Sequence, residues 1–270
     1  MTSYTTTPAG DRVAFDRYGA GPALIFVAGA GPSRESDPIT TATALAAANQ
    51  GITTVVYDRL GRGESPVDGP TTLSRELEAI AALIEIAGGR AVLCGHSSGC
   101  SIALRAAAEG LAITGLVLWE SPIGSISGGA GAWSDEVTRR VESGDLDGAQ
   151  THYMKDMPPE WLEGARQSPM WPAIIAQVGS LRADGESLAW ADSAPLSQLF
   201  EGIRMPVQTI VGERSLPLMT AAAAAIAAAI PGAENKTLPG ANHAWEPESM
   251  AAGLVAFVKA AAEAGPARAS

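Results

Sequence analysis

Residues 95–99 read Gly-His-Ser-Ser-Gly, a pattern that can hold a nucleophilic serine in a tight turn. The turn follows the apolar run Ala91–Cys94 and precedes a small-residue segment typical of a helix. A strand-turn-helix arrangement lifts the serine hydroxyl above the sheet edge, and the helix N-terminus behind it favours developing negative charge. We therefore predict that Ser97 is a nucleophile that attacks a carbonyl carbon. The plainer interpretation is a Gly/Ser-rich turn without chemistry.

A serine nucleophile needs an imidazole that accepts its proton, and the chain has only three histidines. His96 occupies the second position of the turn, where we expect it to pack beneath the serine. His152 lies among charged residues in the middle of the chain and is expected at the surface or at a pocket rim. His243 lies between a short strand and the last helix, after the serine in chain order, which suits this turn. We predict His243 as the base; the alternative is a loop histidine that caps the final helix.

Short strands alternate with longer Ala/Leu-rich segments around these residues. Continuous apolar runs such as Ala23–Val27 are typical of strands buried on both faces of a parallel sheet. The pattern predicts an α/β fold with a mostly parallel eight-stranded sheet flanked by helices. The predicted strands cover residues 3–7, 12–18, 23–27, 53–57, 91–94, 116–119, 207–211 and 236–238, and helices are predicted from Leu73 to Gly88 and over 101–109, 219–230 and 247–262.

The alternation breaks between residues 122 and 195, where no buried strand is predicted. This segment contains four of the six tryptophans, Trp133, Trp161, Trp171 and Trp190. We predict a helical cap over 122–195, inserted into a core formed by residues 1–121 and 196–270. Residues 265–270 are expected to form a frayed tail.

The chain resembles the α/β-hydrolase family on four features. They are the 95–99 turn, the loop Val27–Gly31 where many members have His-Gly-x, the D-x-x-G-x-G-x-S turn Asp58–Ser65, and Gly240–His243 near the C-terminus. Actinobacterial-type members with a Y-D-R-x-G-R-G-x-S turn and a sixth strand ending in x-E-x-P are most similar. The resemblance implies that fold, with the cap after strand six, and it implies a serine hydrolase. The Asp58–Ser65 turn is expected to be structural.

The acid of the expected triad does not stand at its usual place. Members of the family most often have G-x-x-D after the seventh strand, but Ser215 occupies the aspartate position here. Glu120 ends the sixth strand, which lies beside the nucleophile strand in this fold. An acid at the end of strand six resembles the arrangement in zearalenone-type lactonases and certain dehalogenases. We predict Glu120 as the acid; Glu213 is the other candidate, and solvation at a strand end is the plainer account of Glu120.

The resemblance also implies an oxyanion hole and a substrate pocket. The backbone amides of Ala30 and Ser98 are expected to bind the oxyanion. Gly31, Trp171 and Trp245 are predicted to line the pocket, although the tryptophans fit the core of the cap, or a contact to the last helix, equally well.

The implied reaction is cleavage of a carboxylic ester or lactone with a bulky apolar part, through a Ser-His-Glu triad and an acyl-enzyme. A polyketide-type thioesterase or acyltransferase, and a C–C bond hydrolase, would use the same residues. Outside enzymes, a small-molecule receptor on an inactive hydrolase fold is the alternative. Activity should fall as the pH drops through the usual histidine range, near ~6.5.

Composition excludes other classes of protein. The 270 residues carry a net charge of −11 with only 18 Lys+Arg, which argues against nucleic acid and anionic membranes as partners. No signal peptide or apolar run of ~20 residues is visible, so a cytoplasmic protein is expected. Three histidines, two cysteines and no dinucleotide fingerprint predict no metal and no cofactor. Cys94 and Cys100 are expected to be buried. The oligomeric state stays open, with a homodimer as one alternative.

Overall fold

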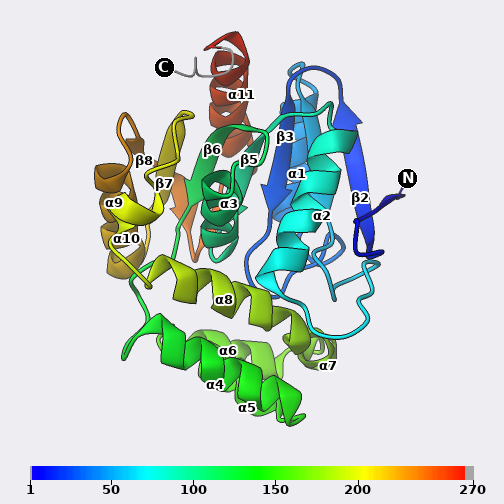
Figure 1. Ribbon diagram of the computed structural model, residues 1–270, viewed down its shortest axis with the longest axis vertical. Coiled ribbons are helices and arrows are strands. Elements are labelled where there is room, and N and C mark those ends of the chain that lie inside the picture. Colours follow the sequence, from blue (N-terminus) through cyan, green and yellow to red (C-terminus); the bar gives the residue numbers. More distant parts are fainter. Residues whose placement is uncertain (1, 265–270) are drawn as a thin grey trace.

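The computed structural model describes residues 2–264, so the tail predicted at 265–270 lies outside the described residues. Its centre is a sheet with the strand order β1-β2-β4-β3-β5-β6-β7-β8-β9 (Figure 1). The strands are β1 (Ser3–Thr6), β2 (Arg12–Gly19), β3 (Ala23–Val27), β4 (Thr53–Tyr57), β5 (Ala91–His96), β6 (Ile113–Trp119), β7 (Val207–Arg214), β8 (Glu234–Ala241) and β9 (Ala244–Trp245). Strands β3 to β8 run parallel, and β1, β2 and β9 pair antiparallel with their neighbours.

The α/β class and the mostly parallel sheet are confirmed, with one correction to the strand count. The described residues form nine strands instead of the predicted eight. The added strand β9 has only two residues, Ala244 and Trp245, and it folds back onto β8. A strand of two residues is too short to show an alternating pattern in the sequence.

Eleven α-helices surround the sheet in the described residues. They are α1 (Pro38–Ala48), α2 (Leu73–Ile86), α3 (Gly99–Ala108), α4 (Ala130–Glu142), α5 (Leu146–Tyr153), α6 (Pro159–Gln167), α7 (Trp171–Ala176), α8 (Leu181–Ala191), α9 (Leu196–Leu199), α10 (Pro217–Ala229) and α11 (Pro247–Ala264). Helix α1 was not predicted, although its start is visible in the sequence. Asp37 caps it by accepting the N–H of Thr40 at 3.0 Å, and Pro38 occupies the first turn.

The two faces of the sheet bury separate apolar clusters. Successive strand residues point to opposite faces, so Leu24 and Phe26 of β3 join one cluster while Ile25 and Val27 join the other. Helices α1 and α11 cover the first face, and α2 and α3 cover the second. Burial on both faces explains why the central strands are continuous apolar runs.

Helices α4 to α8 follow β6 and gather at one end of the sheet (Figure 1). Helix α8 lies between the other four and the core, in contact with α2, α3 and α4. Trp133 of α4 is buried and donates to the carbonyl oxygen of His152 at 3.1 Å, so it belongs to the interior of this helical group. No helix within residues 2–264 is long and apolar enough to cross a lipid bilayer.

The strand order creates a crevice beside β3 and β5. These strands are neighbours in the sheet although β4 separates them in the chain, so their following loops leave in opposite directions. Ligands of open α/β sheets bind at such a switch point, outside the carboxyl ends of the strands. Strand β6 lies next to β5, which brings the residues after β3, β5 and β6 to the same edge.

Candidate active site

Ser97 lies in the turn that joins β5 to α3. Its backbone φ is +55°, in the left-handed region, and its N–H donates to the carbonyl oxygen of Trp119 at 2.9 Å. The turn fits only because glycine follows it: a Cβ on Gly99 would lie 2.1 Å from the carbonyl oxygen of Val27. A Cβ on Gly29 would lie 2.7 Å from Cβ of Ser97, so the loop after β3 touches the turn directly.

Backbone strain marks the same edge of the sheet. Among the described residues, four non-glycine residues have a positive φ: Ser97 (55°), Glu120 (47°), Asn242 (52°) and His243 (63°). Such a conformation costs on the order of 1–3 kcal/mol per residue and persists where the surroundings enforce it. Three of the four are the residues that the sequence proposed for a triad, although no hydrogen bond joins Oγ of Ser97 to His243 within residues 2–264.

His243 is presented by the tight hairpin between β8 and β9. Ala241 pairs with Ala244, leaving Asn242 and His243 as a two-residue loop. Both have positive φ, as the type I′ turn that suits twisted antiparallel strands requires. Asparagine and histidine are both among the non-glycine residues that adopt this conformation most often. The hairpin therefore holds the imidazole on a rigid support.

Glu120 contacts the imidazole from the end of β6. Its Oε2 lies 2.6 Å from Nδ1 of His243, and its Oε1 accepts the N–H of Gly212 at 3.0 Å. Burial acts to raise the pKa of Glu120, but the hydrogen bonds from His243 and Gly212 outweigh burial and hold this pKa below its usual value. Glu213, the other candidate acid, is exposed to solvent. The structure thus brings Glu120 to His243 and leaves Glu213 outside.

His96 packs beneath the turn, as expected from its position. Its Nε2 lies 2.9 Å from the carbonyl oxygen of His243, and its ring centroid lies 4.7 Å from that of His243 and 5.1 Å from that of Trp245. Burial, with the charge of a protonated His243 adding to it, lowers the pKa of His96 to about 4. Neutral His96 therefore supports the hairpin that carries His243.

A pH dependence of stability follows for His96. The unfolded chain takes up its proton near 6.5 and the folded chain near 4, so the stabilisation is complete above pH 6.5 and is lost as the pH falls toward 4. Urea unfolding of wild type and His96→Gln at several pH values measures this. We expect the free energy of unfolding to fall less steeply in His96→Gln, by at most about 1.4 kcal/mol per pH unit. Equal slopes in the two proteins would exclude this account.

Two backbone amides lie close to Ser97 in the sequence or in the adjoining loop. Within residues 2–264, the N–H groups of Ala30 and Ser98 donate no hydrogen bond to another protein group. Ala30 lies in the loop after β3, and Ser98 precedes helix α3, whose dipole adds partial positive charge at this end. Free amides at this position are what an oxyanion hole requires.

A cavity of about 330 Å³ adjoins His243 and is largely apolar. Trp245 lines it and also anchors α1, because its Nε1 donates to Thr43 Oγ1 at 2.8 Å. Trp161 of α6 lines it as well, with its ring centroid 5.7 Å from that of His243. Gly31, which was predicted to line the pocket, does not line this cavity, although its neighbour Pro32 does.

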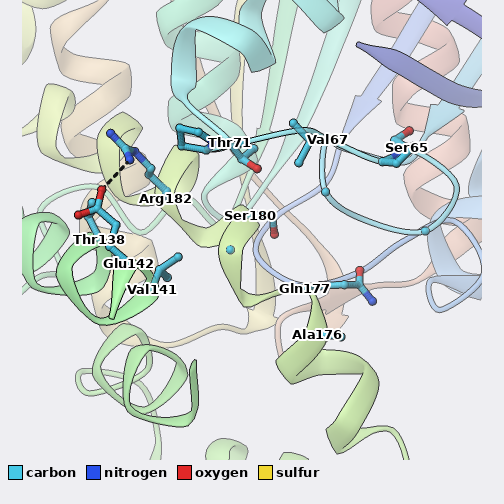
Figure 2. A pocket seen from close by; sticks show the side chains of 16 residues that line it. Ser65, Val67, Thr71, Thr138, Val141, Glu142, Ala176, Gln177, Ser180 and Arg182 are labelled. Atoms are coloured by element: carbon cyan, nitrogen blue, oxygen red, sulfur yellow. Dashed lines mark hydrogen bonds and ion pairs between the residues drawn. The ribbon is translucent and has the colours of Figure 1, made fainter. Parts of the chain in front are cut away.

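Trp171 was predicted in the pocket but does not line this cavity; its ring packs against the guanidinium of Arg166. The reason is that α6, one helix earlier, extends over the hairpin and carries Trp161 there instead. Nothing in the sequence separates these two cap tryptophans. A larger cavity of about 590 Å³ lies between the 61–71 loop and the helices α4 to α8 (Figure 2) and is lined by none of Ser97, Glu120 and His243, whereas His243 alone of the three lines the smaller cavity.

Sequence reasoning also missed three charged residues near the amides. Arg59, Arg62 and Asp184 are buried together beneath the loop after β3. One signal was available: Arg59 follows the buried strand β4 almost directly, and a buried charge needs a partner. Cys94 and Cys100 are buried free thiols, as predicted. Within residues 2–264, no group of three or more His, Cys, Asp or Glu residues is arranged to hold a metal ion.

Comparisons with known proteins found a family model and solved structures that are similar to this chain. A model of the alpha/beta hydrolase family matches residues 24–257. An alpha/beta hydrolase from Sphaerobacter thermophilus shares 30% identity over 94% of this chain and 99% of its own, with a TM-score of 0.81. A thermophilic esterase from Thermogutta terrifontis shares 23% identity over 97% of both chains (TM-score 0.65).

An enol-lactonase from Burkholderia xenovorans shares 19% identity over 97% of this chain and 98% of its own, with a TM-score of 0.62. At 23% and 19% identity, these two structures show a shared fold. A search of curated proteins found no match.

Proposed function

The chain belongs to the alpha/beta hydrolase family, and from that premise we propose that it cleaves a carboxylic ester or lactone through an acyl-enzyme on Ser97. The observation that carries the proposal is the 2.6 Å contact between Glu120 Oε2 and His243 Nδ1. This contact leaves Nε2 as the imidazole nitrogen for proton transfer, as in a Ser-His-acid triad. The strained turn at Ser97 and the free amides of Ala30 and Ser98 supply the remaining groups.

The proposed reaction has two half-reactions. Oγ of Ser97 forms a bond to the carbonyl carbon while its proton passes to His243, and the amides of Ala30 and Ser98 hold the oxyanion. The intermediate collapses as the C–O bond to the leaving group breaks, and His243 returns the proton to the departing oxygen. Water then attacks the acyl-enzyme while His243 takes one of its protons, and the bond from the carbonyl carbon to Oγ of Ser97 breaks as His243 returns this proton to Oγ and the acid leaves. Glu120 stabilises the imidazolium in each half.

The cavity beside His243 supports a substrate with a bulky apolar part. Trp161, Trp245 and Ile39 line it and offer aromatic and aliphatic surface to such a group. The similarity in fold to an esterase and to an enol-lactonase is consistent with oxygen esters as the substrate class.

A panel of aryl esters, lactones of different ring size and thioesters tests the proposal. We expect hydrolysis of esters or lactones with a measurable preference for apolar aromatic groups. A folded enzyme that hydrolyses thioesters but neither of the other classes would refute the ester and lactone assignment.

Trp161 is expected to contribute to substrate binding. Trp161→Ala removes aromatic surface beside His243, so KM for an aryl ester should rise about 10-fold while kcat changes less, since one apolar group contributes ~1–3 kcal/mol. Trp171→Ala is the matched control, because Trp171 belongs to the same helical group but does not line the cavity. A larger rise of KM in Trp171→Ala than in Trp161→Ala would contradict the placement of the pocket.

A further inference from the structure

Four charged side chains are buried near the site and take no part in the mechanism above. Arg59, Arg62, Glu76 and Asp184 each have a side-chain exposure of 0%. The first three belong to the core, and Asp184 belongs to cap helix α8. Buried ion pairs contribute little net stability, because desolvation offsets their attraction, and apolar residues often serve as well. Net stability alone therefore does not explain why these charges are buried together.

Asp184 lies at the centre of this cluster. Its Oδ1 accepts hydrogen bonds from Nη1 of Arg59 and Oγ of Ser98, both at 2.6 Å, and its Oδ2 accepts from Nη2 of Arg62 at 2.8 Å. Burial acts to raise the pKa of Asp184, but the charges of the two arginines outweigh it and hold this pKa below its usual value. The carboxylate is thus ionised, and one of its three partners is the residue that supplies an oxyanion amide.

The arginines extend from Asp184 to the other oxyanion amide. Nη1 of Arg59 donates to the carbonyl oxygen of Ala28 at 3.1 Å, and Nη1 of Arg62 donates to that of Gly29 at 2.5 Å. The C=O of Gly29 and the N–H of Ala30 belong to one planar trans peptide group and point in opposite directions. Fixing the oxygen therefore fixes the direction of the Ala30 N–H, and a guanidinium on the oxygen strengthens that N–H as a donor.

The cap supplies a second contact to the same arginine. Nε of Arg62 donates to Oγ of Ser180 at 2.9 Å. Ser180 directly precedes α8 and lies on the wall of the cavity in Figure 2. Both side chains that orient Arg62 thus come from residues 180–184, at the start of α8.

We propose that Asp184 is a positioning residue for the oxyanion hole, acting through Arg62 on the Gly29–Ala30 peptide and through Ser98 on the nucleophile turn. The oxyanion hole is then complete only when cap helix α8 is docked on the core. This inference rests on the proposed hydrolysis through Ser97. It adds that the cap controls the stabilisation of the transition state as well as the shape of the pocket.

The variants Asp184→Asn and Glu76→Gln test the proposal as a matched pair. Each removes one buried negative charge from the cluster and leaves both arginines. Within residues 2–264, the ion pair of Glu76 is with Arg59, whose Nε lies 3.3 Å from its Oε1. Glu76 forms no hydrogen bond or ion pair with Ser98 or Arg62 in these residues. In Asp184→Asn, the N–H₂ group must face the guanidinium of Arg59 or that of Arg62, because each carboxylate oxygen accepts from one of them, so at least one of these two hydrogen bonds is lost.

We expect Asp184→Asn to lower kcat about 10- to 100-fold with KM within ~3-fold of wild type, because an oxyanion donor acts mainly in the transition state. Glu76→Gln should lose thermal stability to a similar extent and keep kcat within ~3-fold. Loss of kcat in both variants alike, or in neither, would overturn the proposal. If Asp184→Asn does not fold, Arg62→Lys takes its place: it keeps the charge but cannot hold Gly29, Ser180 and Asp184 at once, so the same loss of kcat is expected.

A readout without substrate separates this proposal from the proposed function. The ¹⁵N–¹H resonances of Ala30 and Ser98 should shift in Asp184→Asn by more than in Glu76→Gln. These shifts decide the positioning role even if wild type cleaves no ester, a result that would refute the hydrolysis alone. Equal shifts of both amides in the two variants would refute the positioning role while leaving the hydrolysis intact.

Discussion

Replacing Ser97 by alanine is expected to lower kcat/KM for the best ester or lactone by about 10⁵- to 10⁶-fold. The substitution removes the oxygen that forms the acyl-enzyme, and only binding and the oxyanion amides remain to accelerate hydrolysis. The fold should persist, because the turn is held by backbone contacts such as Ser97 N–H to the Trp119 carbonyl oxygen. Steady-state kinetics together with thermal unfolding measures both quantities.

The control for Ser97→Ala is Ser193→Ala. Ser193 lies after α8, and its Oγ donates only to the carbonyl oxygen of Trp190 at 2.7 Å. Ser193→Ala should leave kcat/KM unchanged. Retention of more than about one hundredth of wild-type activity in Ser97→Ala would show that another group is the nucleophile.

The second large effect concerns the acid. Glu120→Gln keeps the shape of the side chain but removes the charge that stabilises the imidazolium of His243, so kcat should fall by about 10³- to 10⁴-fold. The buried amide also has to place a donor near the N–H of Gly212 or near Nδ1 of His243, which disturbs the imidazole further. Kinetics of purified Glu120→Gln, with circular dichroism as a check of folding, gives the result.

Glu213→Gln serves as the comparison. Glu213 is exposed, so the loss of its charge should change kcat by less than ~2-fold. The reverse outcome, with a retained kcat in Glu120→Gln and a large loss in Glu213→Gln, would move the acid to the seventh strand, where the family usually has it.

Much of the core was predictable because its strands are buried on both faces. Ala23–Val27 and Thr53–Tyr57 match the structure to the residue, since short runs of apolar and β-branched residues are typical of strands buried on both faces. Ser97 could be proposed as the nucleophile because a Gly-x-Ser-x-Gly turn directly follows a buried strand and precedes a helix. Glu120 could be proposed because a charge directly after a buried strand needs a partner.

Contacts between the helices α4 to α8 and the rest of the chain could not be predicted from the sequence. Trp161 and Trp171 stand in similar amphipathic segments, and only the packing of α6 over the β8–β9 hairpin distinguishes them. Asp184 lies in the first turn of α8, 122 or more residues after both arginines. No local pattern encodes that contact, because it depends on how α8 docks. The turn Asp58–Ser65 thus looked purely structural, although it holds Arg59 and Arg62.

Covalent labelling by a fluorophosphonate shows whether Ser97 is an activated nucleophile. We expect one phosphonyl adduct per chain of folded wild type. Mass spectrometry should detect it on the peptide that contains Ser97. The adduct should be absent in Ser97→Ala and should form much more slowly in Glu120→Gln. Folded wild-type protein that takes up no adduct, or that carries it on another residue, would contradict the assignment of Ser97 as a nucleophile activated by His243 and Glu120.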